Sequence, residues 1–89
     1  MSATFHLTIA SVGETRFDGA AVSATFPGTA GEFTVLAHHE PIVTTLKRGV
    51  ITVRLPAPPS EGGSASGGKQ FTIESGVLEC SGSRVVVLL

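Results

Sequence analysis

Residues 22–35 read VSATFPGTAGEFTV, and this stretch decides the fold. Apolar side chains stand at every second position on both sides of a glycine-containing turn: Val22, Ala24 and Phe26 before it, and Phe33 and Val35 after it. Alternation with a period of two is typical of a strand that buries one face. The intervening PGTAG segment carries the residues that tight turns prefer. The stretch therefore predicts two short strands joined as a hairpin.

Similar runs recur along the chain between turn signals, at intervals of roughly ten residues. They occupy residues 5–10, 42–46, 50–55, 71–73, 77–80 and 84–89. Only Lys47-Arg48-Gly49 separates two of these runs, which predicts a second hairpin. No segment has a credible helical pattern. We therefore expect an all-β domain, a small antiparallel β-sandwich or flattened barrel of about 8–10 short strands.

Chain length limits the domain organisation. A chain of 89 residues can build only one small core, so residues 1–89 are expected to form a single domain. Residues 56–69 read PAPPSEGGSASGGK, in which the prolines favour extension and the glycines and serines have nothing to bury. We expect a mobile hairpin loop there.

Composition excludes several classes of protein. A net charge of −1 and a pI near 6.2 provide no basic field for a phosphate backbone, so nucleic acid is a poor candidate ligand. No run approaches the ~20 apolar residues of a membrane helix, so we expect no direct membrane insertion. The single cysteine, Cys80, can form no intrachain disulfide and fits a small apolar role in a reducing compartment.

Some predicted strands are apolar on both faces, although each sheet of an antiparallel sandwich can bury only one face by itself. These are residues 42–43, 50–51, 77–78 and 85–89. Either loops and end strands cover the surplus, or it forms an exposed patch that binds a protein partner. The composition thus favours an interaction protein.

Residues 26–41 read FPGTAGEFTVLAHHEP, in which Pro27-Gly28 and Gly31-Glu32 lead through an apolar strand to His39-x-Pro41. This spacing resembles the signature of the epsilon subunit of rotary F-type ATP synthases. Flanking segments agree: Phe5-His6-Leu7, Phe17-x-Gly19, Leu46-Lys47-x-Gly49 and Gly76-Val77-Leu78-Glu79. The resemblance covers nearly the whole chain except residues 56–69, and it implies the N-terminal β-sandwich domain of that subunit.

Four positions depart from the family pattern: Thr34, His38, Glu40 and Ser75. At His38 the family usually has glycine, and loss of glycine from a turn that needs positive φ costs about 1 kcal/mol or more. The family also continues into two helices, which can restrain ATP hydrolysis and in some bacteria bind ATP. With no residues beyond Leu89, we expect neither property of this chain.

The resemblance implies a non-catalytic rotor subunit at the foot of the central stalk. Such a subunit links the gamma subunit to the c-ring during proton- or ion-driven ATP synthesis, and meets the other F1 subunits indirectly. It would be peripheral on the cytoplasmic face of the bacterial inner membrane. The family match assigns Gly31 and Glu32 to the c-ring contact. The resemblance assigns Ser11, His39 and Thr44 to the gamma contact, and we expect Val43, Val50 and Val86 to supply its apolar contacts.

Other functions have weaker support in the residues. A generic sandwich adaptor could bind an extended peptide at an open sheet edge. A small hydrolase using His38 or His39 with Ser11 or Cys80 lacks a nucleophile elbow, a carboxylate pair or a phosphate-binding loop. A metal site at residues 38–40 is disfavoured because adjacent strand residues point to opposite faces. We expect no catalytic residue, metal or cofactor.

Overall fold

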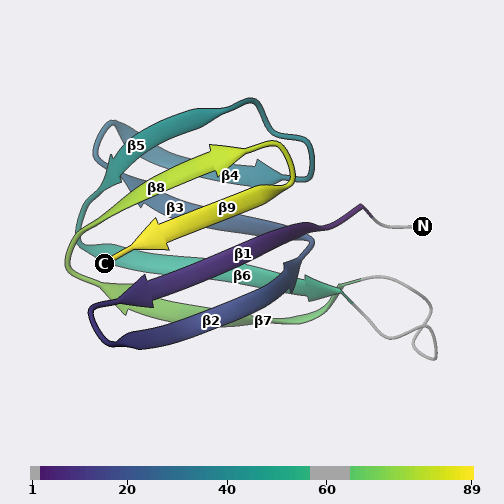
Figure 1. The fold of residues 1–89 in the computed structure, drawn as a ribbon, viewed down its shortest axis with the longest axis horizontal. Coiled ribbons are helices and arrows are strands. Elements are labelled where there is room, and N and C mark those ends of the chain that lie inside the picture. Colours follow the sequence, from purple (N-terminus) through teal and green to yellow (C-terminus); the bar gives the residue numbers. More distant parts are fainter. Residues whose placement is uncertain (1–2, 57–64) are drawn as a thin grey trace.

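A computed structural model of the protein describes residues 3–56 and 65–89. These described residues form nine strands and no helix (Figure 1). In chain order the strands are β1 (Phe5–Ser11), β2 (Glu14–Ala21), β3 (Ser23–Gly28), β4 (Gly31–Leu36), β5 (Ile42–Leu46), β6 (Gly49–Pro56), β7 (Ala65–Ile73), β8 (Gly76–Ser81) and β9 (Arg84–Leu88). The predicted all-β fold is confirmed.

The strands form one curled sheet in the order β2-β1-β9-β8-β5-β3-β6-β7, with β4 paired to β3 off this path. Figure 1 shows β1, β8 and β9 lying across β3 and β6, so the curl produces two facing layers. The pairs are antiparallel except for β1 and β9, which run parallel from His6↔Arg84 to Ala10↔Leu88. This parallel pair departs from the purely antiparallel sandwich that the sequence predicts.

The hairpin predicted from residues 22–35 is confirmed. β3 and β4 pair from Ser23↔Leu36 to Gly28↔Gly31. The turn places Gly31 at φ 136°, a backbone conformation that side chains with a Cβ rarely adopt. The alternating apolar residues of both strands point inward, and the rings of Phe26 and Phe33 lie 5.6 Å apart.

One core joins the inward faces of both layers. It consists of Phe5, Leu7, Ile9, Ala21, Ala24, Phe26, Val35, Leu46, Ile51, Val53, Ile73, Leu78, Cys80, Val85 and Val87. At one side Phe17 of β2 meets Phe71 of β7 edge-to-face, with ring centroids 6.0 Å apart. Because β2 and β7 end the strand path, this contact closes the curl. Cys80 is buried as predicted, and burial raises the pKa of its thiol.

The predicted second hairpin is wrong, although residues 42–46 and 50–55 both lie in strands. β5 pairs with β8 on one edge and with the end of β3 on the other, while β6 pairs with β3 and β7. A strand has only two edges, and both edges of β5 and of β6 are already paired. The two strands therefore cannot pair with each other. The amide of Lys47 donates to the carbonyl of Pro27 at 2.8 Å, which fixes the point where the chain crosses between layers.

Both ends of the loop expected at residues 56–69 lie in strands, at Pro56 and at residues 65–69. β7 begins at Ala65, and its first residues pair with β6 up to Pro56↔Ala65. At Gly68 an added Cβ would lie 2.7 Å from the carbonyl oxygen of Val53, so this glycine permits close backbone approach. Apolar periodicity cannot reveal a strand held by main-chain bonds alone. The remaining positions of the predicted loop, 57–64, lie outside the described residues.

The connection between β4 and β5 contains a strained residue. His38 has φ 63° and is the one non-glycine residue with positive φ in the described part of the chain. The expectation that this position requires the conformation that glycine adopts most readily is confirmed. A side chain with a Cβ pays about 1–2 kcal/mol in this region of φ and ψ.

His38→Gly should therefore stabilise the domain by about 0.5–1 kcal/mol, because relief of strain outweighs the added freedom of the unfolded chain. Thermal unfolding followed by circular dichroism should show a melting temperature a few degrees higher. His39→Gly is the matched control: its φ is not positive, so the same replacement should lower the melting temperature. Equal shifts in both variants would contradict the strain at His38.

Candidate functional site

Exposed apolar side chains gather on the outer face of β5, β8 and β9. Val43, Val77, Val86 and Leu88 form this group, which we call the outer apolar patch. Val77 and Leu88 are direct partners across β8 and β9, and Val86 stands one same-face step from Leu88. Val43, Leu88 and Val77 are 69%, 58% and 44% exposed, and Val86 is half-buried. The patch is therefore contiguous and open to solvent.

Strand alternation explains why these residues face outward. Their chain neighbours Leu78, Val85 and Val87 are fully buried in the core. With the inner face filled, the second set of apolar residues has no place inside the sandwich. The predicted surplus of apolar residues on strand faces is confirmed at this surface.

A polar cluster adjoins the patch on β1, β2 and β9. Nε2 of His6 lies 2.5 Å from Oδ1 of Asp18, and the hydroxyl of Thr8 donates to the same oxygen at 3.2 Å. The hydrogen bonds from His6 and Thr8, together with the charge of Arg84, lower the pKa of the Asp18 carboxyl below its usual 3.8. An apolar centre with a hydrogen-bonded polar margin is the usual anatomy of a protein interface.

The proposed c-ring residues lie together at the β3–β4 turn. Gly31 and Glu32 are both exposed, and Glu32 stands opposite Pro27 in the register of the hairpin. Within residues 3–56 and 65–89, Glu32 forms no ion pair. The turn thus presents a free carboxylate on a firmly paired hairpin.

The structure does not bring all six predicted gamma contacts together. Val43 and Val86 belong to the outer apolar patch, on either side of Glu79 in the strand register. The other four lie elsewhere: Ser11 at the end of β1, His39 in the β4–β5 connection, Thr44 beside Leu78 on the inward side of β5, and Val50 on β6. Val50 is 43% exposed, but its strand, β6, pairs with β3 and β7 and with none of the strands that carry the patch.

Sequence reasoning missed Val77 and Leu88 as site residues. Both lie in runs already recognised as apolar on two faces, so the signal was present. What the sequence could not supply was the pairing of β8 with β9, which makes the two residues neighbours.

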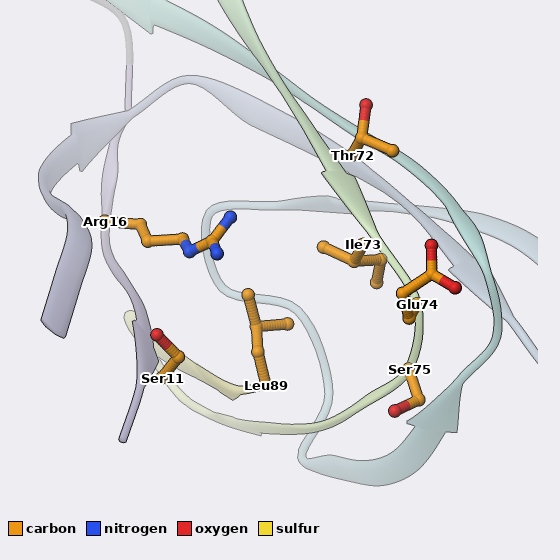
Figure 2. A pocket seen from close by; sticks show the side chains of 7 residues that line it. All are labelled: Ser11, Arg16, Thr72, Ile73, Glu74, Ser75 and Leu89. Carbon is orange, nitrogen blue, oxygen red and sulfur yellow. The ribbon is translucent and has the colours of Figure 1, made fainter. Parts of the chain in front are cut away.

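A pocket of about 280 Å³ lies at another end of the sandwich. Its lining is Ser11, Arg16, Thr72, Ile73, Glu74, Ser75 and Leu89. In Figure 2 the guanidinium of Arg16 extends into the space between Leu89 and Ile73. Arg16 also approaches Glu14, with Nε 3.4 Å from Oε1. Of the predicted site residues only Ser11 lines this pocket, so it is separate from the outer apolar patch.

The hydrolase pairing considered from sequence is not assembled. Nδ1 of His39 lies 2.8 Å from the carbonyl oxygen of Glu40, and Cys80 is buried in the core. Among the described residues no hydrogen bond joins His38 or His39 to Ser11 or Cys80.

Comparison with known proteins identifies the family. Residues 4–89 match the family model described as "ATP synthase, Delta/Epsilon chain, beta-sandwich domain". The chain belongs to this family. The epsilon-subunit resemblance read from the sequence is confirmed, and the epsilon subunit is a non-catalytic stalk subunit.

Bacterial epsilon chains are among the similar sequences. The ATP synthase epsilon chain of Rhodopseudomonas palustris is 32% identical over 87 residues, which are 97% of this chain and 57% of that relative. The epsilon chain of Mesorhizobium japonicum is 46% identical over 48 residues, 54% of this chain and 29% of the relative. The match therefore spans 57% of the first of these relatives and 29% of the second. This epsilon-family chain covers only part of the length of either.

Solved structures share the fold. A chain of the Euglena gracilis mitochondrial ATP synthase (OSCP/F1/c-ring) matches with a TM-score of 0.80 and 26% identity, covering 97% of this chain and 50% of the other. A chain of the Tetrahymena thermophila mitochondrial ATP synthase (central stalk/c-ring) matches with a TM-score of 0.71 and 10% identity. The match covers 93% of this chain and 60% of the other. In the described part of the epsilon-family chain, no helix has the length and apolar character needed to span a membrane.

The low pKa of Asp18 predicts a pH-dependent contribution to stability. Because the folded-state pKa lies below the unfolded value of 3.8, this carboxylate stabilises the fold above that pH and loses its effect as the pH falls through the folded-state pKa. Asp18→Asn should lower the melting temperature near neutral pH, and the difference from wild type should close in acid. Glu79→Gln is the control, and a gap for Asp18→Asn that stays constant with pH would contradict the prediction.

Proposed function

We propose that this epsilon-family chain is a central-stalk rotor component that links the gamma subunit to the c-ring for ion-driven ATP synthesis. The observation that carries the proposal is the family match over residues 4–89, joined to an exposed apolar patch on a rigid sandwich. Both structural relatives come from ATP synthase assemblies that include a c-ring. The bacterial relatives support a location in the F1 sector on the cytoplasmic face of the inner membrane.

We propose the outer apolar patch as the surface that docks on gamma, with Val43 and Val86 as contacts. Burial of apolar area supplies about 25 cal/mol per Å², so covering these side chains would provide much of the affinity. The patch lies on paired strands above a close-packed core, and such interiors transmit force with little deformation. This is the mechanical property that a torque-bearing link needs. Outside the patch we keep four further proposed gamma contacts: Ser11, His39, Thr44 and Val50.

We propose the β3–β4 turn as the c-ring contact. Glu32 is exposed, and its position is fixed by the hairpin register and by the turn conformation at Gly31. An exposed ion pair contributes only about 0–1 kcal/mol. Glu32 therefore acts in orientation and register with the polar loops of the ring, while apolar burial on the gamma side supplies most of the binding.

The gamma contact can be tested with charge insertions in the outer apolar patch. Val43→Asp and Val86→Asp should each weaken binding of the isolated gamma subunit by about 30-fold or more, because docking would bury an unpaired carboxylate. Binding is measured by isothermal titration calorimetry with the cognate gamma subunit.

The matched control is Val12→Asp. Val12 lies fully exposed in the β1–β2 turn, outside the patch, so the same replacement there should leave the affinity unchanged. Val50→Asp tests that separate proposed contact on its own. Retained affinity in both Val43→Asp and Val86→Asp, with folding confirmed by circular dichroism, would reject this face as the gamma surface.

The c-ring contact can be tested by cross-linking from Glu32→Cys. The native Cys80 is 2% exposed, and burial raises the pKa of its thiol, so the introduced cysteine should be the reactive one. In an assembled ATP synthase carrying the variant, a thiol-reactive photo-cross-linker should join position 32 to subunit c. A cysteine at the exposed position Glu74 serves as the comparison site, and equal cross-linking from both positions would count against the assignment.

A further inference from the structure

A single carboxylate stands inside the outer apolar patch. Glu79 of β8 is paired in register with Val43 of β5 on one side and with Val86 of β9 on the other. Val77 precedes it by one same-face step along β8. Directly opposed side chains on one sheet face have Cβ atoms about 4.5–5.5 Å apart. Glu79 therefore has apolar neighbours on three sides.

No group in the described part of the chain neutralises this carboxylate. Among residues 3–56 and 65–89, Glu79 forms no ion pair and no side-chain hydrogen bond. The nearest basic residue in the register of this face is Arg84, which is paired with Ser81 and so is diagonal to Glu79. Arg84 acts on Asp18, whose pKa its charge helps to lower. The Glu79 side chain is exposed, so water can solvate its charge in the free protein.

Docking of an apolar surface on the patch would remove this water. Valine side chains can donate no hydrogen bond to the carboxylate, and an unpaired charge taken out of water carries a large penalty. The patch can then be covered tightly only if the incoming surface brings its own cation to this position. Glu79 would reject an apolar partner that lacks such a cation.

We infer that Glu79 is a specificity-determining residue of the outer apolar patch, and that the partner presents to it a lysine or arginine surrounded by apolar side chains. This inference rests on the proposed function, in which gamma is that partner. An arginine suits the position best, because its planar fork can bind both carboxylate oxygens. The valines would supply contact area, and the charge pair would fix which surface docks and in which register.

Binding of the cognate gamma subunit to four variants tests the inference. Glu79→Gln keeps the shape but removes the charge, and should weaken binding about 30-fold or more, as when one member of a desolvated charge pair is removed. Glu79→Leu should weaken it at least as much. Glu79→Asp, which keeps the charge on a shorter stem, should retain more affinity than Glu79→Gln. Glu74→Gln, an exposed carboxylate outside the patch, should bind like wild type.

The outcomes separate two failures. If wild-type protein binds gamma and Glu79→Gln or Glu79→Leu binds equally well or more tightly, no cation faces Glu79 and the inference is overturned while the docking surface stands. Equal weakening by Glu79→Gln and Glu74→Gln would point to net charge alone and would also overturn it. If wild-type protein does not bind gamma at all, the proposed function fails, and the inference fails with it.

Discussion

The fold depends on one strand that changes partners along its length. β3 pairs with β6 through residues 23–25, and near Gly28 it pairs with β5. Its other edge is occupied throughout by β4. Because each strand offers only two edges, this switch joins the two layers into a single curled sheet and fixes where β5 and β6 can lie. The ring contact between Phe17 and Phe71 then closes the opposite side.

The same pairing determines what the surface can do. Once the core is filled from the inward faces, the alternate residues of β5, β8 and β9 must face water, and their apolar character makes this face a candidate docking surface. The exposed charge of Glu79 within the patch contributes little to folding. For Glu79 we propose a role in partner selection, which is where interfacial charges act most strongly. A stiff core and an apolar outer face are thus two consequences of one strand order.

Local signals predicted much of this molecule. The alternation around Phe26 and Val35 indicated a hairpin, and the loss of glycine at His38 indicated strain, because both are properties of a few adjacent residues. The second hairpin failed for the opposite reason: the choice of β8 as the partner of β5 depends on residues 30 to 38 positions away. The start of β7 was missed because glycines paired through their main chain leave no apolar pattern.

The sequence by itself determined the all-β class, the single core, the family and the excess of apolar residues on several strands, since periodicity and motif spacing are written along the chain. Only the tertiary structure decided that Val43, Glu79 and Val86 stand in one row, and that Val50 and Thr44 stand outside it. The physical reason is that a surface is made by cross-strand neighbours. Those neighbours are set by long-range strand pairing, which local sequence does not specify.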